Sequence, residues 1–242
     1  MKIFKSLALL LFFVTTLSSA QNKDITLEEI WDGTFRTERL DALHSMKNGQ
    51  QYSVLNYENK ASQIDIYDYK TLSKVSTLVN SRDISEIAYF SNYTFSDDET
   101  KVLLATNVES IFRRSTLGEF YVYDTKTKTT TLISEEKIQE PTFSPDGNKI
   151  AYGLNNNLFV KDLSTGKTQQ ITTDGEKNKI INGITDWVYE EEFSFVRAFE
   201  WNADGSKIAF IRFDETNVPE FSMDVYGQQL YQTQTVFKYP KA

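Results

Sequence analysis

FSPDGNKIAY (Phe143–Tyr152) decides the fold of this chain, because the same turn followed by the same apolar segment recurs along the sequence. Trp201–Phe210 (WNADGSKIAF) matches it almost position for position, and Phe95–Leu104 (FSDDETKVLL) is a weaker copy. The weakest copy runs from Ser45 to Tyr52, so the copies begin at residues 45, 95, 143 and 201. Repeats of about 40–50 residues with turn signals of this kind are typical of the blades of a β-propeller.

Each repeat carries the residues of two hairpins. Asp146-Gly147 supplies the left-handed backbone conformation that a tight turn demands, and the apolar residues after it begin a strand. Ile64–Asp68, Phe120–Asp124 and Leu158–Asp162 each precede a further polar turn and a return segment rich in Thr, Val or Ile. We therefore expect four strands in each repeat, with the turn residues serving as scaffold rather than as catalysts.

The composition agrees with a fold made of strands. The chain contains 17 Phe, 13 Tyr and 3 Trp, and aromatic residues favour strands. One short helix is predicted at Thr26–Trp31, where Thr26 and Glu29 have the spacing of a capping box. The predicted fold is all-β, a partial β-propeller of about four four-stranded blades preceded by one short N-terminal helix. Closed propellers have about 4–8 blades, so these blades form a small ring or part of a larger one.

The N-terminal residues have the pattern of a secretory signal peptide. Two lysines precede the apolar run Leu7–Val14, and small residues suited to cleavage follow at 18–20. This predicts a signal peptide at 1–20, a lead-in segment with the short helix at 21–40 and propeller blades at 41–242. The expected location is outside the cytoplasm, in the periplasm or secreted. We expect no membrane span after removal of the signal, because no later stretch is apolar enough.

The composition also excludes several classes of function. The formal net charge is −8, and nucleic acids and anionic lipids bind basic surfaces, so neither is an expected partner. The chain has no Cys, one histidine (His44, expected to be structural) and no Gly-x-Ser-x-Gly motif. Asp97-Asp98-Glu99 has the acids of a calcium site but occupies a repeat turn, so we expect no metal and no cofactor. These residues do not predict a self-sufficient enzyme, and no catalytic residue is assigned to this chain.

The most unusual stretch is DWVYEEEF, residues Asp186–Phe193. Three adjacent carboxylates, those of Glu190, Glu191 and Glu192, follow large apolar and aromatic residues. Carboxylates repel one another and resist desolvation, and a cation would relieve both costs. The run therefore predicts a site for a ligand ammonium or a nearby arginine. The alternative is an acidic surface that is simply solvated.

The same run belongs to a resemblance to a known family. The sequence resembles the N-terminal β-propeller of the dipeptidyl peptidase IV family of serine exopeptidases through 182–192 (NGITDWVYEEE), 213–219 (FDETNVP) and the terminal Tyr239–Ala242. The likeness extends from about Leu27 to the end of the sequence. It implies an eight-bladed propeller that caps an α/β-hydrolase domain with the catalytic triad. The second half of the propeller and the hydrolase domain are absent from this sequence.

The resemblance also implies a function and a set of substrate-binding residues. Enzymes of the family remove X-Pro or X-Ala dipeptides from peptide N-termini. Glu191 and Glu192 would hold the α-ammonium of the substrate, and Glu190 would be structural support. Arg113 would contact a substrate carbonyl and pair with the glutamates, with the adjacent Arg114 as the alternative. The implied partners are peptides with a free N-terminus, the missing α/β-hydrolase domain and a second copy of the protein in a homodimer.

Two other functions remain open on the sequence alone. A free-standing exported propeller could bind peptides or proteins without catalysis, and a hydrolase motif further along the gene would decide against it. A relative of the prolyl tripeptidyl peptidases would have the same architecture with the binding site set one residue longer. The double glutamate favours the dipeptide version.

Overall fold

The computed structural model describes residues 24–37 and 42–238. The predicted signal peptide at 1–20 and the terminal Tyr239–Ala242 lie outside the described residues. The chain divides into two compact units, 1–40 and 41–242, and each is described by itself. Within the described ranges, no helix is long and apolar enough to cross a membrane.

The described part of the first unit contains one helix, α2 (Leu27–Trp31). Thr26 caps it, because its side chain accepts a hydrogen bond from the backbone N–H of Glu29 at 3.2 Å. The Glu29 carboxylate accepts in return from the N–H of Thr26 at 3.2 Å. This reciprocal pair is the capping box that the sequence predicts, and the predicted short helix is confirmed.

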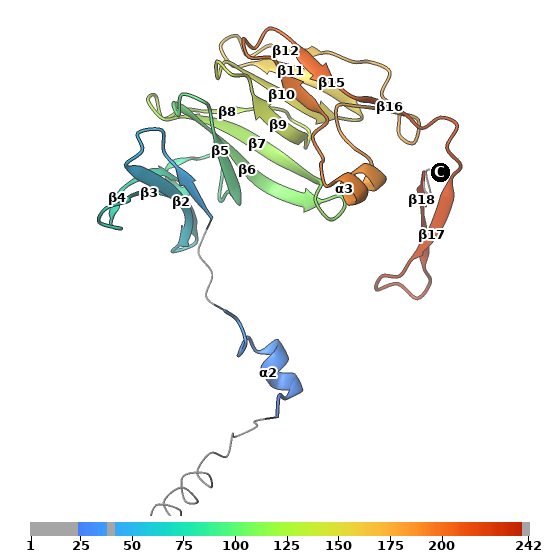
Figure 1. Cartoon of the computed structure of the whole chain (residues 1–242), viewed down its shortest axis with the longest axis horizontal. Helices are drawn as coiled ribbons and strands as arrows, with labels where there is room; N and C mark the ends of the chain where they lie inside the picture. The colour runs from blue at the N-terminus through green and yellow to red at the C-terminus, as the bar shows by residue number, and fades with distance from the viewer. Residues whose placement is uncertain (1–23, 38–41, 239–242) are drawn as a thin grey trace, which may run out of the picture. The chain divides into compact units, whose positions relative to one another are not determined.

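The second unit contains three antiparallel four-stranded sheets that follow one another along the chain (Figure 1). The first consists of β1 (Leu43–Ser45), β2 (Gln51–Glu58), β3 (Ala61–Asp68) and β4 (Lys74–Asn80), followed by the 3-10 helix η1 (Ser81–Asp83). The second consists of β5 (Asn92–Phe95), β6 (Lys101–Ser110), β7 (Thr116–Asp124) and β8 (Thr130–Leu132). The third consists of β9 (Gln139–Phe143), β10 (Lys149–Leu154), β11 (Asn157–Asp162) and β12 (Thr168–Gln170). In all three the strand order equals the chain order, which confirms four strands per blade for these repeats.

The fourth repeat departs from the predicted four-stranded blade. It forms separate two-stranded sheets from β13 (Ile180–Asn182) with β16 (Arg212–Asp214), β14 (Phe199–Trp201) with β15 (Ile208–Phe210), and β17 (Phe221–Val225) with β18 (Thr233–Phe237). A second helix, α3 (Trp187–Phe193), lies between β13 and β14 in the chain. Ile211 donates to the carbonyl of Ala198 and accepts from Gly183, so β15 and β16 are nearly one strand that faces two partners. The inserted helix separates those partners and divides the sheet.

The repeated turns all have the same local structure. Each joins the first two strands of its repeat, and the residues Gly49, Glu99, Gly147 and Gly205 have φ angles of 66°, 57°, 67° and 67°. Glu99 takes the glycine position at a conformational cost. Its carboxylate accepts from the N–H of Lys47 at 2.7 Å, and Lys47 also pairs with Asp97 at 2.8 Å. These acids therefore join neighbouring turns, and the described residues contain no group of three or more His, Cys, Asp or Glu able to hold a metal ion.

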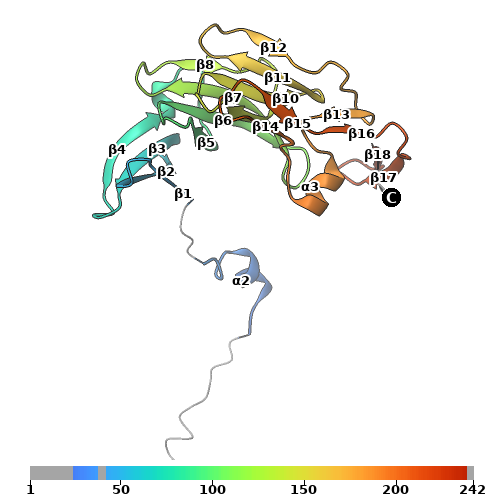
Figure 2. The same ribbon diagram turned by 45° about the horizontal axis from the view of Figure 1, so that its top comes forward.

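Buried side chains between consecutive sheets form the core, and they follow the two-residue period of a strand. In β6, Val102 and Leu104 pack toward the first sheet, whereas Leu103 packs toward the third. Ala151 of β10 and Phe199 of β14 continue the core into the fourth repeat. Figure 2 shows the sheets one after another in this order. The stacking of each sheet on the next explains why a single repeat cannot bury its apolar faces alone.

His44 packs against aromatic rings of the second sheet. Its ring centroid lies 5.7 Å from that of Tyr93, edge to face, and 5.9 Å from that of Phe95. The geometry agrees with the structural role expected for this histidine.

We predict that the turn aspartates make the fold sensitive to acid. Burial opposes ionisation of Asp98, but hydrogen bonds from Ser96 and Thr100 outweigh it and lower the pKa to about 2. Hydrogen bonds from Ser164 and Thr165 lower the pKa of Asp162 to about 2 as well. Since both folded-state values lie below the usual 3.8, the ionised carboxylates stabilise the fold above that pH, and this contribution is lost as the pH falls toward 2.

The measurement is the free energy of unfolding by urea as a function of pH. The double variant Asp98→Asn, Asp162→Asn retains side-chain acceptors but cannot titrate at these positions, so its stability should fall less steeply in this range. Equal slopes in the two proteins would contradict the prediction.

Candidate functional site

The acidic run of the sequence forms the short helix α3. Asp186 is its N-cap, because its carboxylate accepts from the backbone N–H of Tyr189 at 3.0 Å. Ser194 ends it in the left-handed conformation, with φ 59°, and donates its N–H to the carbonyl of Glu190 at 3.1 Å. The sequence patterns described above do not predict this helix. Asp186 is a start signal that could have indicated it, but a serine replaces the glycine that usually marks an end.

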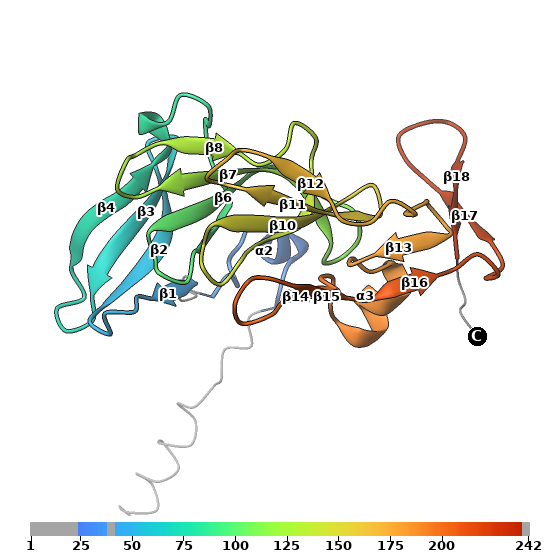
Figure 3. The same cartoon turned by 90° about the horizontal axis from the view of Figure 1, so that it is seen from above.

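An aromatic cluster fixes α3 to the sheets of the fourth repeat. The ring of Tyr189 lies 4.5 Å from that of Phe213 in β16 and 6.2 Å from that of Phe195, centroid to centroid. Tyr189 and Phe195 pack against a buried cluster of Ile181, Ile184, Ala198 and Phe213. In Figure 3, α3 lies next to β16, the strand that carries Phe213. This packing determines which side of the helix faces outward.

The three glutamates of α3 lie in three different environments. Glu190 is fully buried, and its Oε1 accepts a hydrogen bond from the backbone N–H of Arg114. The Glu191 side chain is 18% exposed, and its Oε1 lies 2.9 Å from Nε of Arg113. Glu192 is exposed. Three identical residues in sequence are therefore distinct in structure.

The structure distinguishes the two arginines that the sequence left as alternatives. Arg113 forms the ion pair with Glu191, while the guanidinium of Arg114 donates from Nη2 to Oγ of Ser194 at 3.3 Å. Arg113 is thus the arginine that the fold brings to Glu191. Its contact with a substrate stays a prediction. Arg114 and Ser194 form a contact that the sequence did not indicate, because it joins segments far apart in the chain.

The electrostatics of this surface favour a cation. Glu191 and Glu192 lie in the last turn of α3, which has no basic residue of its own, and the helix dipole disfavours negative charge there. The Arg113 side chain is 74% exposed, and an ion pair so open to water stabilises the fold by about 0–1 kcal/mol. The carboxylates therefore remain able to accept a further positive charge.

A further carboxylate, that of Glu140, lies near Glu190. Glu140 belongs to β9, is half-buried and has φ 51° next to an irregularity in the β9–β10 pairing. Burial raises its pKa; Arg197 partly offsets this rise, and the charge of Glu190 adds to it. The sequence contains no sign of this proximity, because β9 and α3 belong to different repeats.

A cavity of about 480 Å³ adjoins the N-terminal end of α3. Its wall includes Trp187 and Val188 of the helix and Phe112, the residue before Arg113. The hydroxyl of Ser115 is buried in this wall and has no hydrogen-bond partner among the described residues. Residues close in the chain to Arg113 and to Glu191 therefore line a cavity with both polar and apolar walls.

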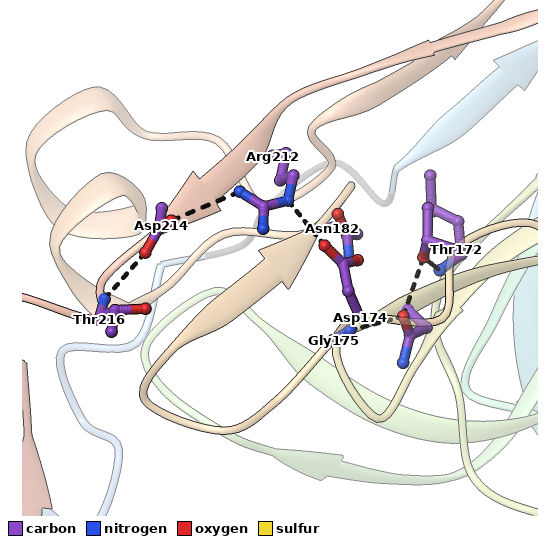
Figure 4. A network of polar contacts seen from close by, with 9 residues as sticks. Thr172, Asp174, Gly175, Asn182, Arg212, Asp214 and Thr216 are labelled. Atoms are coloured by element: carbon purple, nitrogen blue, oxygen red, sulfur yellow. Dashed lines mark hydrogen bonds and ion pairs between the residues drawn. The ribbon is translucent and has the colours of Figure 1, made fainter.

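A polar network supports the strand from which the α3 segment begins (Figure 4). Asp174 accepts from Nδ2 of Asn182 at 2.9 Å and from Nε of Arg212 at 2.8 Å, and Nη1 of Arg212 lies 3.6 Å from Asp214. The hydrogen bond from Arg212 is the main cause of the lowered pKa of Asp174. Because Asn182 and Arg212 lie in β13 and β16, the network fastens the preceding loop to both strands.

The comparison with protein families identifies the family of this chain. The family described as "Dipeptidyl peptidase IV (DPP IV) N-terminal region" matches residues 96–242. This range includes α3, both arginines and the last three repeated turns.

Individual relatives agree with this match. "Probable dipeptidyl-aminopeptidase B" of Neurospora crassa is 29% identical over 258 residues, which covers 94% of this chain and 28% of that protein. The protein of the same name from Chaetomium globosum is 36% identical over 162 residues, or 61% of this chain and 18% of that protein. Human "Prolyl endopeptidase FAP" is 31% identical over 221 residues, or 90% and 28%.

A solved structure has the same fold. The crystal structure of Porphyromonas gingivalis dipeptidyl peptidase 4 superposes with a TM-score of 0.82 and 38% identity over 91% of this chain and 32% of that chain. The chain thus spans 18% to 32% of the length of these four proteins.

Proposed function

The chain belongs to the family of the dipeptidyl peptidase IV N-terminal region, and from this premise we propose that it is the substrate-recognition propeller of an exported serine dipeptidyl peptidase. In this proposal Glu191 and Glu192 bind the α-ammonium of a peptide, and Arg113 contacts a backbone carbonyl of the same peptide. The catalytic serine, aspartate and histidine belong to an α/β-hydrolase domain that is not part of this sequence.

One observation carries the proposal: the ion pair of 2.9 Å between Nε of Arg113 and Oε1 of Glu191, with exposed Glu192 next in the chain. A peptide N-terminus presents an ammonium and, one residue later, a carbonyl. Carboxylates and a guanidinium held side by side offer the complementary groups, and charge-assisted hydrogen bonds are about twice as strong as neutral ones.

The proposed site would fix the distance between the peptide N-terminus and the bond that is cleaved. An ammonium held by two carboxylates must be a free N-terminus, since a longer chain would collide with the acids. The peptide would then reach the hydrolase domain with its second peptide bond at the nucleophile, and X-Pro or X-Ala dipeptides would be released. Fixed positioning of this kind is a general source of rate enhancement.

The test uses the complete protein with a Gly-Pro chromogenic substrate and its N-acetylated form. We expect release from the free peptide and a kcat/KM lower by at least about 30-fold for the acetylated one, because acetylation removes a charge that the acids would otherwise bind, at a cost of about 2 kcal/mol or more. Equal turnover of the two would contradict the proposal and favour an endopeptidase, as one relative is named. Cleavage of Ala-Ala-Pro in preference to Gly-Pro would favour a tripeptidyl peptidase.

Export is part of the same proposal. The lysines and apolar run at the start of the sequence support it. The N-terminal residue of the protein isolated from its source tests this directly, since cleavage after Ala20 would leave Gln21 first.

A further inference from the structure

The segment between β6 and β7 carries Arg113 but has few hydrogen bonds of its own. The N–H groups of Ile111 and Phe112 both reach the carbonyl of Ser115, at 2.9 and 3.5 Å. Arg113 and Arg114 lie at the tip of this turn and are exposed. Exposed turns with so few internal bonds open readily, so the position of Arg113 must be held from outside the turn.

Besides the ion pair of Arg113 with Glu191, two contacts from α3 hold the turn through Arg114. The backbone N–H of Arg114 donates to Oε1 of Glu190, and its guanidinium donates to Oγ of Ser194 at 3.3 Å. Glu190 begins the last turn of α3 and Ser194 is its C-cap. The two contacts therefore attach Arg114, in the β6–β7 connection, to the start and the end of the last helical turn of α3, which carries Glu191.

Glu190 is fully buried, although its second carboxylate oxygen has no hydrogen-bond partner among the described residues. Burying a carboxylate in this way is costly, and an apolar side chain would fill the same space without that cost. The bond that Oε1 accepts from Arg114 is the contact that an apolar residue could not make.

We propose that Glu190 is a positioning residue, and that Glu190, Arg114 and Ser194 form a clamp that holds Arg113 opposite Glu191. The amide that Glu190 binds follows Arg113 directly, and consecutive Cα atoms are about 3.8 Å apart, so fixing this amide fixes the backbone from which the Arg113 side chain extends. The clamp is a feature of this chain's own structure. Its consequence for peptide binding rests on the function proposed above.

The test compares amide hydrogen exchange in this chain for Glu190→Ala, Glu190→Gln and Ser194→Ala. Loss of one hydrogen bond should speed exchange across residues 111–115 by about 10-fold in Glu190→Ala. Glu190→Gln keeps an oxygen acceptor of the same reach and should restore most of the protection, while Ser194→Ala should have a smaller effect in the same direction. Glu176→Gln, which removes an exposed carboxylate that pairs with Lys179, controls for the change in charge.

The kinetics of Gly-Pro-Ala cleavage by the complete protein give the second readout. Glu190→Ala should raise KM about 10-fold with little change in kcat, and Glu190→Gln should rescue it. Unchanged exchange at 111–115 in Glu190→Ala would overturn the clamp. Faster exchange throughout β10 and β11 as well would also overturn it, because Glu190 would then be a general support of the fold. A third outcome separates the two proposals. If exchange in Glu190→Ala is faster only at 111–115 but the unaltered complete protein does not bind Gly-Pro-Ala, the clamp stands and the proposed function is refuted.

Discussion

Replacing Glu191 with glutamine is expected to lower the affinity of the complete protein for Gly-Pro-Ala by at least about 30-fold. Glu191 is mostly buried and already paired with Arg113, so an arriving ammonium meets a carboxylate whose position is fixed. A bound ammonium and this largely buried carboxylate would form a charge pair shielded from water, and removing one partner of such a pair costs about 2–5 kcal/mol. Glutamine keeps the shape and one oxygen, and the loss therefore measures the charge rather than the packing.

The measurement is calorimetric titration of the complete protein, with its catalytic serine replaced by alanine so that no peptide is cleaved, with Gly-Pro-Ala and with its N-acetylated form. Glu191→Gln should reduce binding of the free peptide and leave the weak binding of the acetylated peptide unchanged. Glu176→Gln is the matched control, because Glu176 is an exposed acid in an i,i+3 ion pair and its loss should change affinity by less than about twofold. If Glu191→Gln bound the free peptide as well as the unaltered protein does, the assignment of this residue would be wrong.

A cycle with Arg113→Ala separates the roles of the two partners. Arg113 and Glu191 are in contact, and residues in contact show coupling energies of about 0.5–3 kcal/mol. The double variant should therefore bind more tightly than the sum of the two single losses predicts. Additive losses would mean that the ion pair is unimportant for binding.

Replacing Gly183 with alanine should unfold or strongly destabilise the fourth repeat. Gly183 has φ +73°, and a Cβ there would lie 2.5 Å from Cδ2 of the fully buried Leu158. The left-handed conformation costs a non-glycine residue about 1–2 kcal/mol, and overpacking a core costs about 1–3 kcal/mol more. We expect the free energy of unfolding to fall by about 2–5 kcal/mol, as the sum of these two effects.

Gly166 provides the matched control for this experiment. Its φ is +71°, but a Cβ there would meet nothing within 4 Å. Gly166→Ala therefore measures the backbone cost alone, about 1–2 kcal/mol, and urea unfolding of the two variants isolates the effect of the contact with Leu158. Equal losses of stability in the two variants would show that Leu158 moves aside and that its close contact with Gly183 is unimportant.

The elements that were predictable from the sequence are those determined by neighbouring residues. The turn at Asp146-Gly147 and its copies predicted the hairpins, because a residue suited to the left-handed conformation between two apolar segments marks a hairpin without reference to any distant part of the chain. Thr26 and Glu29 predicted α2, because a capping box is also formed by residues close together in the chain. The fourth blade was not predictable in this way, since its strands are divided by α3 and its pairing partners depend on distant segments.

The candidate site shows the same division. The resemblance indicated Arg113, Glu191 and Glu192, and it left Arg114 as an alternative that the structure places on Ser194 instead. Neither the buried bond between Glu190 and Arg114 nor the proximity of Glu140 could be read from the sequence, because these partners belong to different repeats and the first two are 76 residues apart.

The sequence by itself determined the repeat, the strand-forming segments, the turns and the unusual cluster of acids, because these depend on local conformational preferences and on composition. Only the tertiary structure decided that Glu190 is buried, that Glu191 faces Arg113 and that Glu192 is open to solvent. Three identical side chains acquire three environments because a helix turns by about 100° per residue, and the packing of Tyr189 on Phe213 sets which of them faces the protein.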